Sequence, residues 1–278
     1  MRRPVLRYHG GKWRLAPWII SQFPAHRCYV EPFGGAGSVL MRKPRSYAEV
    51  WNDRWGLVVN VFRVLRDPVQ AGELERLIRL TPFAREEFEG TDSEQMAGIE
   101  DPVERARRVI LRSFAGFRNG AVNTERATGF RRDSQRFWTV PAHDWAGYPD
   151  HIGTFVERLQ GVIIENRPAV DVIREHDSGE TLFYVDPPYP HCTRDMRRES
   201  AGYKYEMEDD DHRALAAVLR GVEGMVVIGS YPCELYDEEL YGDWKRLERR
   251  CWADGARERT EVLHLSPPLC ERQLRLAI

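Results

Sequence analysis

Short apolar strands alternate with helical segments in both outer parts of the chain, and this alternation limits the fold more than any other feature. The expected strands are residues 28–31, 47–51, 162–165, 181–185 and 225–228, and the expected helices begin near 39 or span 55–66, 169–175 and 209–219. Strands that alternate with helices favour a sheet with helices on both faces. Residues 244–252 and 260–265 add a final hairpin around 254–256. The pattern therefore predicts an α/β fold.

A middle segment of different character interrupts the alternation between residues 67 and 160. It holds helical patterns at 70–80 and 102–115, followed by residues 116–149, which are rich in Arg, Gly, Asn, Thr and aromatic residues and have no clear period. A stretch of that length without regular structure is usually functional or poorly ordered. We therefore expect residues 1–66 and 161–278 to form one domain and residues 67–160 to form a mainly helical insertion.

The composition excludes several classes of protein. The chain has 41 basic and 43 acidic residues, and this net charge of −2 excludes a polybasic or acidic-tail protein. The five cysteines are widely spaced without a CxxC pair, which argues against a disulfide framework or a zinc site. No apolar run approaches the roughly 20 residues of a membrane helix, and no signal peptide is recognisable. We expect a cytoplasmic protein with no membrane partner and no metal.

A glycine-rich turn follows the first strand. Glu31-Pro32-Phe33-Gly34-Gly35-Ala36-Gly37 stands between this strand and a helix start, and such a turn lets the backbone approach a ligand closely. Asp53 ends the next strand, 19 residues after Gly34, and an acid at about that distance commonly binds ribose hydroxyls. The glycines are too compact for GxGxxG, and no GK[ST] follows. The pattern indicates an adenosine-type cofactor site, with a plain tight turn as the alternative.

A proline-rich tetrapeptide follows the apolar strand 181–185. The prolines of Asp186-Pro187-Pro188-Tyr189 fix the backbone, so a carboxylate, a prolyl carbonyl and an aromatic ring can converge at the end of the strand. Two such acceptors suit the two hydrogens of an exocyclic amine on a planar base, and the ring suits its face. The tetrapeptide predicts a catalytic site for an aromatic amine, with a proline turn beside a core tyrosine as the alternative.

Several segments stand in an order that resembles the Dam-type, or alpha-group, adenine-N6 DNA methyltransferases over nearly the whole chain. The matching segments are Tyr8 to Lys12, Glu31 to Gly37, Asn52-Asp53, Asp186 to Tyr189, Tyr203 to Met207 with Asp211-His212, Ser230-Tyr231, and Arg259 to Leu263. The resemblance implies a Rossmann-like fold with S-adenosylmethionine as cofactor. It also implies methyl transfer to N6 of adenine in duplex DNA after base flipping.

The resemblance implies roles for particular residues. The implied catalytic residues are Asp186, Pro187, Pro188 and Tyr189. The implied cofactor-binding residues are Tyr8, Gly11, Lys12, Glu31, Pro32, Phe33, Gly34, Gly35, Gly37, Asp53 and Asp186. Residues 1–66 and 161–278 are then the catalytic domain, and residues 67–160 are the DNA target-recognition region. The family often has an acid after the strand 162–165, whereas Asn166-Arg167-Pro168 stands there and Asp171 follows, so no residue is assigned to the cofactor adenine.

Arginines gather in the middle segment. Between Arg105 and Arg136 there are nine, opposed only by Glu125 and Asp133, so this stretch carries +7. Arginines mixed with amides and aromatic residues suit phosphate and base contacts. The expected DNA contacts are Arg118, Asn119, Asn123, Arg126, Arg131 and Arg132, while residues 105–112 are equally well read as a solvated helix face. The sequence predicts a local cationic surface on an otherwise acidic enzyme.

Other functions remain as alternatives. The same active-site logic methylates amines in RNA or amides in proteins, although the protein enzymes usually have Asn in place of Asp186. A catalytically inactive relic that only binds DNA is a second alternative, and a nicotinamide dehydrogenase is a third that does not explain the tetrapeptide. We expect a monomer, and the resemblance leaves open a cognate restriction endonuclease as a partner.

Overall fold

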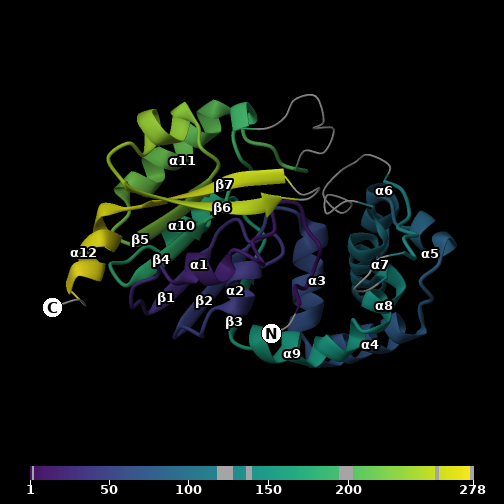
Figure 1. The fold of residues 1–278 in the computed structure, drawn as a ribbon. Coiled ribbons are helices and arrows are strands. Elements are labelled where there is room, and N and C mark those ends of the chain that lie inside the picture. Colours follow the sequence, from purple (N-terminus) through teal and green to yellow (C-terminus); the bar gives the residue numbers. More distant parts are fainter. Residues whose placement is uncertain (2, 118–127, 136–139, 194–202, 254–256, 276–278) are drawn as a thin grey trace.

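The strands form one mixed sheet at the centre of the molecule. The computed structural model describes all residues except 2, 118–127, 136–139, 194–202, 254–256 and 276–278. Within the described residues the sheet has seven strands in the order β3-β2-β1-β4-β5-β7-β6 (Figure 1). They are β1 (Cys28–Glu31), β2 (Ala48–Asn52), β3 (Val162–Glu165), β4 (Thr181–Val185), β5 (Met225–Ser230), β6 (Lys245–Ala253) and β7 (Arg257–Leu265). The first five run parallel, and the hairpin β6–β7 joins β5 in antiparallel orientation.

Both faces of the sheet are buried, because alternate strand residues enter two different hydrophobic clusters. In β4, Leu182 and Tyr184 belong to one cluster, and Phe183 and Val185 belong to the other. This is the period of two that a strand imposes on its side chains. Helices α1 (Ala16–Ile20), α2 (Ser38–Arg42) and α3 (Gly56–Arg66) contribute to the first cluster, and α10 (Ala169–Glu175) and α11 (Asp209–Gly221) contribute to the second. The predicted α/β fold with helices on both faces is confirmed.

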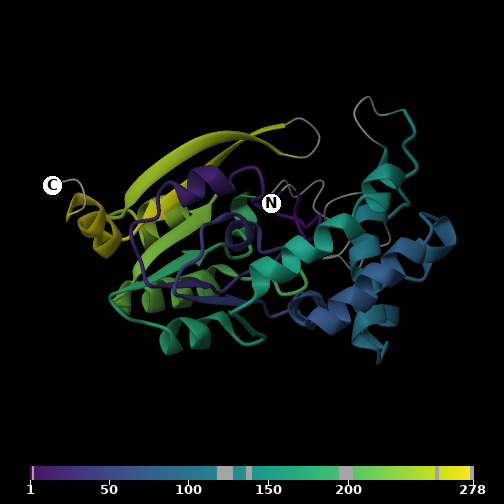
Figure 2. The ribbon, with the colours of Figure 1, turned by 90° about the horizontal axis from the view of Figure 1, so that it is seen from below.

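A group of helices lies between α3 and β3 in the chain. They are α4 (Pro68–Leu80), α5 (Arg85–Glu89), α6 (Ser93–Ala97), α7 (Pro102–Ala115), α8 (Pro141–Ala146) and α9 (Ile152–Leu159). Asp67 and Asp101 cap the amino ends of α4 and α7. The Asp67 carboxylate accepts from the amides of Val69 and Gln70, and the Asp101 carboxylate accepts from the amide of Val103. Figures 1 and 2 both place these helices to one side of the sheet, next to α3.

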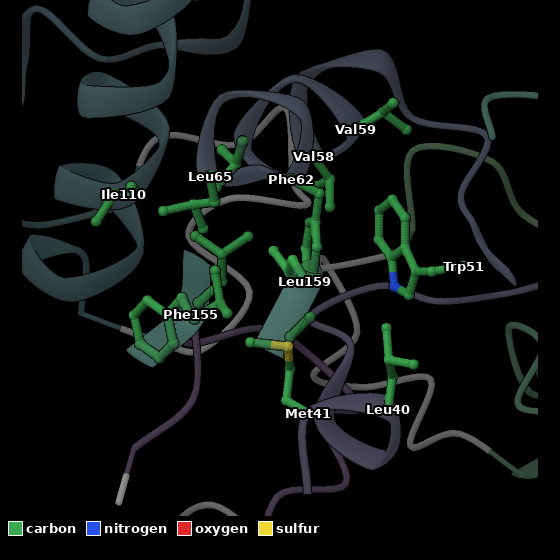
Figure 3. Packing of buried hydrophobic residues seen from close by; sticks show 14 of the residues in the cluster. Leu40, Met41, Trp51, Val58, Val59, Phe62, Leu65, Ile110, Phe155 and Leu159 are labelled. Atoms are coloured by element: carbon green, nitrogen blue, oxygen red, sulfur yellow. The ribbon is translucent and has the colours of Figure 1, made fainter. Parts of the chain in front are cut away.

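The helical segment shares a hydrophobic core with the sheet. Ile110 of α7 and Phe155 of α9 lie in the same buried cluster as Leu65 of α3 and Trp51 of β2 (Figure 3). Because this cluster is continuous, the segment is packed against α3 rather than joined to it by a linker. None of the helices within the described residues has the length and apolarity to cross a membrane.

The arginines of α7 are used inside the protein. Arg107 is 9% exposed and pairs with Glu104 and Glu87, and Arg112 is 5% exposed and donates to the carbonyl of Thr91. Arg105 and Arg108 likewise donate to backbone carbonyls, those of Ile99 and Gly90. The interpretation of residues 105–112 as a solvated face, and their share in the cationic surface, are therefore wrong. The groups that accept from these arginines lie before residue 105, outside the stretch 105–136 for which the charge of +7 was summed.

Several elements were not predicted. Helices α1, α5 and α6 have five residues each, which is too short for a helical period to be recognised. Helix α8 lies inside the stretch that had no clear period, and η2 (Pro149–His151) and α9 follow it. Helix α12 (Pro267–Arg275) follows β7 near the carboxyl end of the chain and was also not predicted.

Candidate active site

A cavity of about 300 Å³ opens at the carboxyl ends of β1, β2 and β4. The chain leaves β1 toward β2 on one side, and β4 lies on the other side, so β1 stands where the strand order reverses. Ligands bind at such switch points in open α/β sheets. Eleven residues expected from the sequence line it: Tyr8, Gly11, Lys12, Glu31, Pro32, Phe33, Gly34, Gly35, Asp53, Asp186 and Pro188. The two sequence motifs therefore meet in one site.

The glycine turn is held by close packing at its first glycine. A Cβ atom on Gly34 would lie 2.0 Å from Nε1 of Trp51, whose buried indole stacks on Phe62 at 4.0 Å between ring centroids. Gly35 has φ = 48°, in the left-handed region that side chains disfavour. These restraints keep the turn narrow, and the ring of Tyr8 lies against it.

Asp53 fastens the glycine turn to the end of β2. Its Oδ2 accepts a hydrogen bond of 2.9 Å from the amide of Gly35, and its Oδ1 accepts one of 2.7 Å from the amide of Trp55. Burial raises the pKa of Asp53 to about 6 in spite of these donors. Each oxygen has a further lone pair, so the carboxylate can still accept from a ligand hydroxyl at the cavity wall.

Glu31 is a buried carboxyl at the end of β1. It is 2% exposed, and its Oε2 accepts a hydrogen bond of 3.1 Å from the amide of Leu40, in the first turn of α2. Burial raises the pKa of Glu31 to about 8, and the nearby charge of Asp186 acts in the same direction. Glu31 is therefore largely protonated at neutral pH in this structure.

Replacing Glu31 by Gln is expected to raise the melting temperature, and to raise it more at about pH 8.5 than at about pH 5. The folded chain keeps the Glu31 proton up to a pH of about 8, whereas a free glutamate has a pKa of 4.5. The wild type therefore loses stability as the pH rises between these values, and glutamine does not. Thermal unfolding of both proteins at both pH values measures this, and an equal shift at the two would contradict it.

Asp186 lies at the end of β4 with its carboxylate partly exposed to the cavity. Its Oδ1 is 2.9 Å from Nζ of Lys12 and accepts a hydrogen bond of 3.1 Å from the Tyr189 hydroxyl. Both contacts use the same oxygen, so Oδ2 stands outside them. Gly229 of β5 lies behind the group, where a Cβ atom would come within 3.4 Å of Oδ1. The carboxylate is thus oriented by two donors and backed by a close strand.

The Tyr189 ring is buried beside Asp186. It is 7% exposed, with the Lys12 ammonium 4.7 Å from its centroid and the ring of Tyr231 edge-on at 4.8 Å. Tyr189, Pro187 and Gly37 lie outside the cavity lining, in contrast to Asp186 and Pro188. Stacking of a base on Tyr189 therefore stays a prediction.

Lys12 and Glu261 complete the polar cluster, and the sequence assigned no role to Glu261. Nζ of Lys12 donates to the carbonyl of Gly10 at 2.9 Å and lies 3.5 Å from Oε1 of Glu261. Burial disfavours the Lys12 charge, but the carboxylates of Asp186 and Glu261 outweigh this and raise the pKa of Lys12 above its ordinary value. The ammonium expected to bind cofactor is thus committed to two carboxylates.

Residues 203–207, which follow the tetrapeptide in the sequence, also line the cavity. The Tyr203 ring is 5.3 Å from that of His9, and the guanidinium of Arg54 is 4.9 Å from the ring of Tyr205. Arg167 and Pro168 line the cavity where the resemblance would place an acid. Asn166 and Asp171 are not among the residues that line the cavity, and Asn166 donates to the carbonyls of Asp53 and Arg54.

The expected DNA contacts fall into two groups. Arg118, Asn119, Asn123 and Arg126 lie outside the described residues. Arg131 is 4% exposed and directs Nη1 at the carbonyl of Phe114, while Arg132 is exposed. The two described arginines differ, because Arg131 points inward and Arg132 is exposed.

Comparison with known proteins bears on the whole site. A family model described as D12 class N6 adenine-specific DNA methyltransferase matches residues 8–246. The matched range contains the glycine turn, Asp53 and the tetrapeptide, and ends before Glu261. A search of curated proteins finds no match.

Proposed function

The chain belongs to the D12 class of N6 adenine-specific DNA methyltransferases, and on that premise we propose how its residues carry out the reaction. The observation that carries the proposal is Asp186, whose Oδ2 stands outside the contacts of Oδ1 beside a cavity at the sheet edge. We propose that the enzyme flips one adenine out of duplex DNA at a specific sequence and methylates its N6 amine at Asp186.

The cavity suits S-adenosylmethionine, the methyl donor that this family uses. Its volume of about 300 Å³ is at the lower end of small-molecule sites. The carboxylate of Asp53 can accept from ribose hydroxyls, and Tyr8 and Phe33 offer apolar rings to the remainder. When bound, the cofactor supplies an electrophilic methyl group on a positively charged sulfur. Asp53 therefore suits the ribose of the cofactor, and the rings of Tyr8 and Phe33 suit its less polar parts.

Asp186 and the Pro187 carbonyl would accept the two hydrogens of the target amine, which orients the nitrogen lone pair. Positioning of this kind supplies much of the acceleration when no strong nucleophile is needed. The carboxylate also stabilises the positive charge that develops on N6, before the N6 proton is released to solvent. Flipping costs a few kcal/mol, and contact with Tyr189 would return roughly 1–3 kcal/mol.

The helical segment 67–160 is proposed as the region that recognises the target sequence. Arg132 is exposed near the end of the stretch that was expected to contact DNA. Arg131 beside it is buried, and among the residues that the structure describes its Nη2 has no hydrogen-bond partner. A buried donor without a partner costs free energy, so turning this guanidinium outward to a phosphate would relieve that cost. These two arginines support a DNA contact at this end of α7.

Substitution of Arg132 and Arg107 by Gln should separate DNA binding from stability. Arg132→Gln is expected to weaken DNA binding and to reduce the slope of log affinity against log salt by roughly 1. Arg107→Gln is expected to lower the free energy of unfolding by about 2 kcal/mol, because it removes the buried partner of Glu87 and leaves Glu104 with Arg108 alone. Fluorescence anisotropy at several salt concentrations, together with urea unfolding, measures both. The reverse assignment of the two effects would contradict the account.

Base flipping is tested after the methylated sequence has been mapped on mixed-sequence duplex DNA. We expect 2-aminopurine in place of the target adenine to fluoresce strongly when the enzyme binds, because it leaves the stack. The same duplex with 2-aminopurine at a neighbouring position is the control. No difference between the two would contradict flipping. Binding without any methylation would instead favour the inactive relic. A cytoplasmic location, a monomer and a partner endonuclease stay predictions.

A further inference from the structure

Glu261 stands in the catalytic cluster although it comes from a distant strand. It lies on β7, next to Val262, which pairs with Ser230 at the end of β5. The residue is 2% exposed, its Oε1 lies 3.5 Å from Nζ of Lys12, and it accepts a hydrogen bond from the Tyr189 hydroxyl. β7 therefore delivers a buried carboxylate to the residues that hold Asp186.

We propose that Glu261 is a positioning residue for methyl transfer, because it accepts the hydrogen bond of the Tyr189 hydroxyl and forms a second ion pair with Lys12. Asp186 is then left as the acceptor for the substrate amine. This inference rests on the proposed role of Asp186 and extends it to the residues that keep its carboxylate available.

The Tyr189 hydroxyl has one proton and two carboxylate acceptors. Oδ1 of Asp186 is 3.1 Å away, which is long for an O–H···O hydrogen bond. Glu261 is the nearer acceptor. Without it, the hydroxyl would donate more strongly to Asp186, whose Oδ1 it already contacts. Tyr189 would then compete with the substrate amine for the same carboxylate.

The Lys12 ammonium likewise contacts both acids, Asp186 and Glu261. Its Nζ contacts Asp186 at 2.9 Å, the carbonyl of Gly10 at 2.9 Å and Glu261 at 3.5 Å. With Glu261 neutral, the full charge of Lys12 would be paired with Asp186 and would weaken it as an acceptor. A carboxylate buried beside another carboxylate is unfavourable for stability alone, which favours a functional reason for Glu261.

The test compares Glu261→Gln with Glu258→Gln, which changes an exposed glutamate three residues earlier on the same strand. We expect Glu261→Gln to lower kcat about 10- to 100-fold, the equivalent of one hydrogen bond to a charged group. The KM for DNA, and the Kd for S-adenosylmethionine measured by calorimetry, should change less than about 3-fold, on the order of experimental scatter for a group outside the binding contacts. Glu258→Gln should keep the wild-type kcat.

A double-mutant cycle with Tyr189→Phe separates positioning from a general structural role. In the Tyr189→Phe background the hydroxyl that Glu261 restrains is gone, so Glu261→Gln should cost less than about 5-fold. Glu261→Asp keeps the charge and withdraws the carboxylate by one methylene, and it serves in place of the Gln variant if that does not fold. It should lower kcat about 10-fold.

Three outcomes would overturn the inference. They are a wild-type kcat in Glu261→Gln or Glu261→Asp, an equal loss with and without the Tyr189 hydroxyl, or a loss of cofactor affinity as large as the loss of kcat. Asp186→Ala distinguishes this failure from that of the proposed function. If Asp186→Ala is inactive while Glu261→Gln is unaffected, only the role of Glu261 fails. If Asp186→Ala stays active, the proposed function fails as well.

Discussion

Asp186→Ala is expected to reduce kcat for methyl transfer by roughly 100- to 1,000-fold, while the Kd for DNA changes little and the Kd for S-adenosylmethionine rises by less than kcat falls. The substitution removes the carboxylate that would hold the amine and stabilise its developing charge, and losses of 10² to 10³ follow removal of one such group. Lys12 and Tyr189 lose their contacts with Asp186 at the same time and keep those with Glu261. Initial rates with labelled cofactor, together with calorimetry for binding, measure the two effects separately.

Asp210→Ala is the matched control for this prediction. Asp210 lies in the first turn of α11, and its side chain is 95% exposed and pairs only with Arg213 among the contacts that the structure describes. We expect wild-type rates from it. A rate for Asp186→Ala within about 10-fold of wild type, with unchanged cofactor and DNA binding, would show that the amine is activated by other groups.

Gly34→Ala is expected to have the second largest effect, through the structure of the cofactor turn. The new Cβ would lie 2.0 Å from Nε1 of Trp51 and 2.4 Å from Cε2, and Trp51 is fully buried against Phe62. Because neither the backbone nor the indole has room to move, overpacking should cost about 3 kcal/mol or more of stability. The displaced turn should also weaken cofactor binding by at least about 100-fold, since small displacements at a site have effects of that order.

Gly72→Ala provides the comparison. Gly72 lies in α4, and a Cβ there meets nothing within 4 Å. Alanine in an open helix position should raise the free energy of unfolding by roughly 0.5–1 kcal/mol and leave cofactor binding unchanged. Urea unfolding and calorimetry measure both variants. A stable Gly34→Ala protein that binds cofactor normally would mean that the packing of Trp51 does not define the turn.

The outer parts of the fold could be predicted because their signals are local. A strand directs successive side chains to opposite faces of its sheet, and the structure places the alternate residues of Thr181–Val185 in two clusters. The end of each parallel strand is also defined locally, so Asp53 and Asp186 could be assigned to one edge of the sheet before their distances were known. The D12 family match then confirms the methyltransferase assignment.

The remaining features depend on partners far away in the sequence. Arg107 and Arg112 were predicted to be part of a cationic surface, because the charge sum over 105–136 gives no sign of their partners. These partners are Glu87 and the carbonyl of Thr91. Glu261 is 75 residues from Asp186, and only the antiparallel pairing of β7 with β5 brings it to the cluster. Lys12, from the segment before α1, meets Asp186 and Glu261 only in the folded chain. A local pattern specifies which side chains are present, and the tertiary fold decides what neutralises them.

Mass spectrometry of nucleosides from treated DNA tests the central claim most directly. Mixed-sequence duplex DNA is incubated with the wild-type protein and S-adenosylmethionine, in parallel with Asp186→Ala, and then digested to nucleosides. The account predicts N6-methyladenine with the wild type and none above background with the variant. Methylated cytosine, or no methylated nucleoside from folded wild-type protein that binds cofactor and DNA, would contradict it.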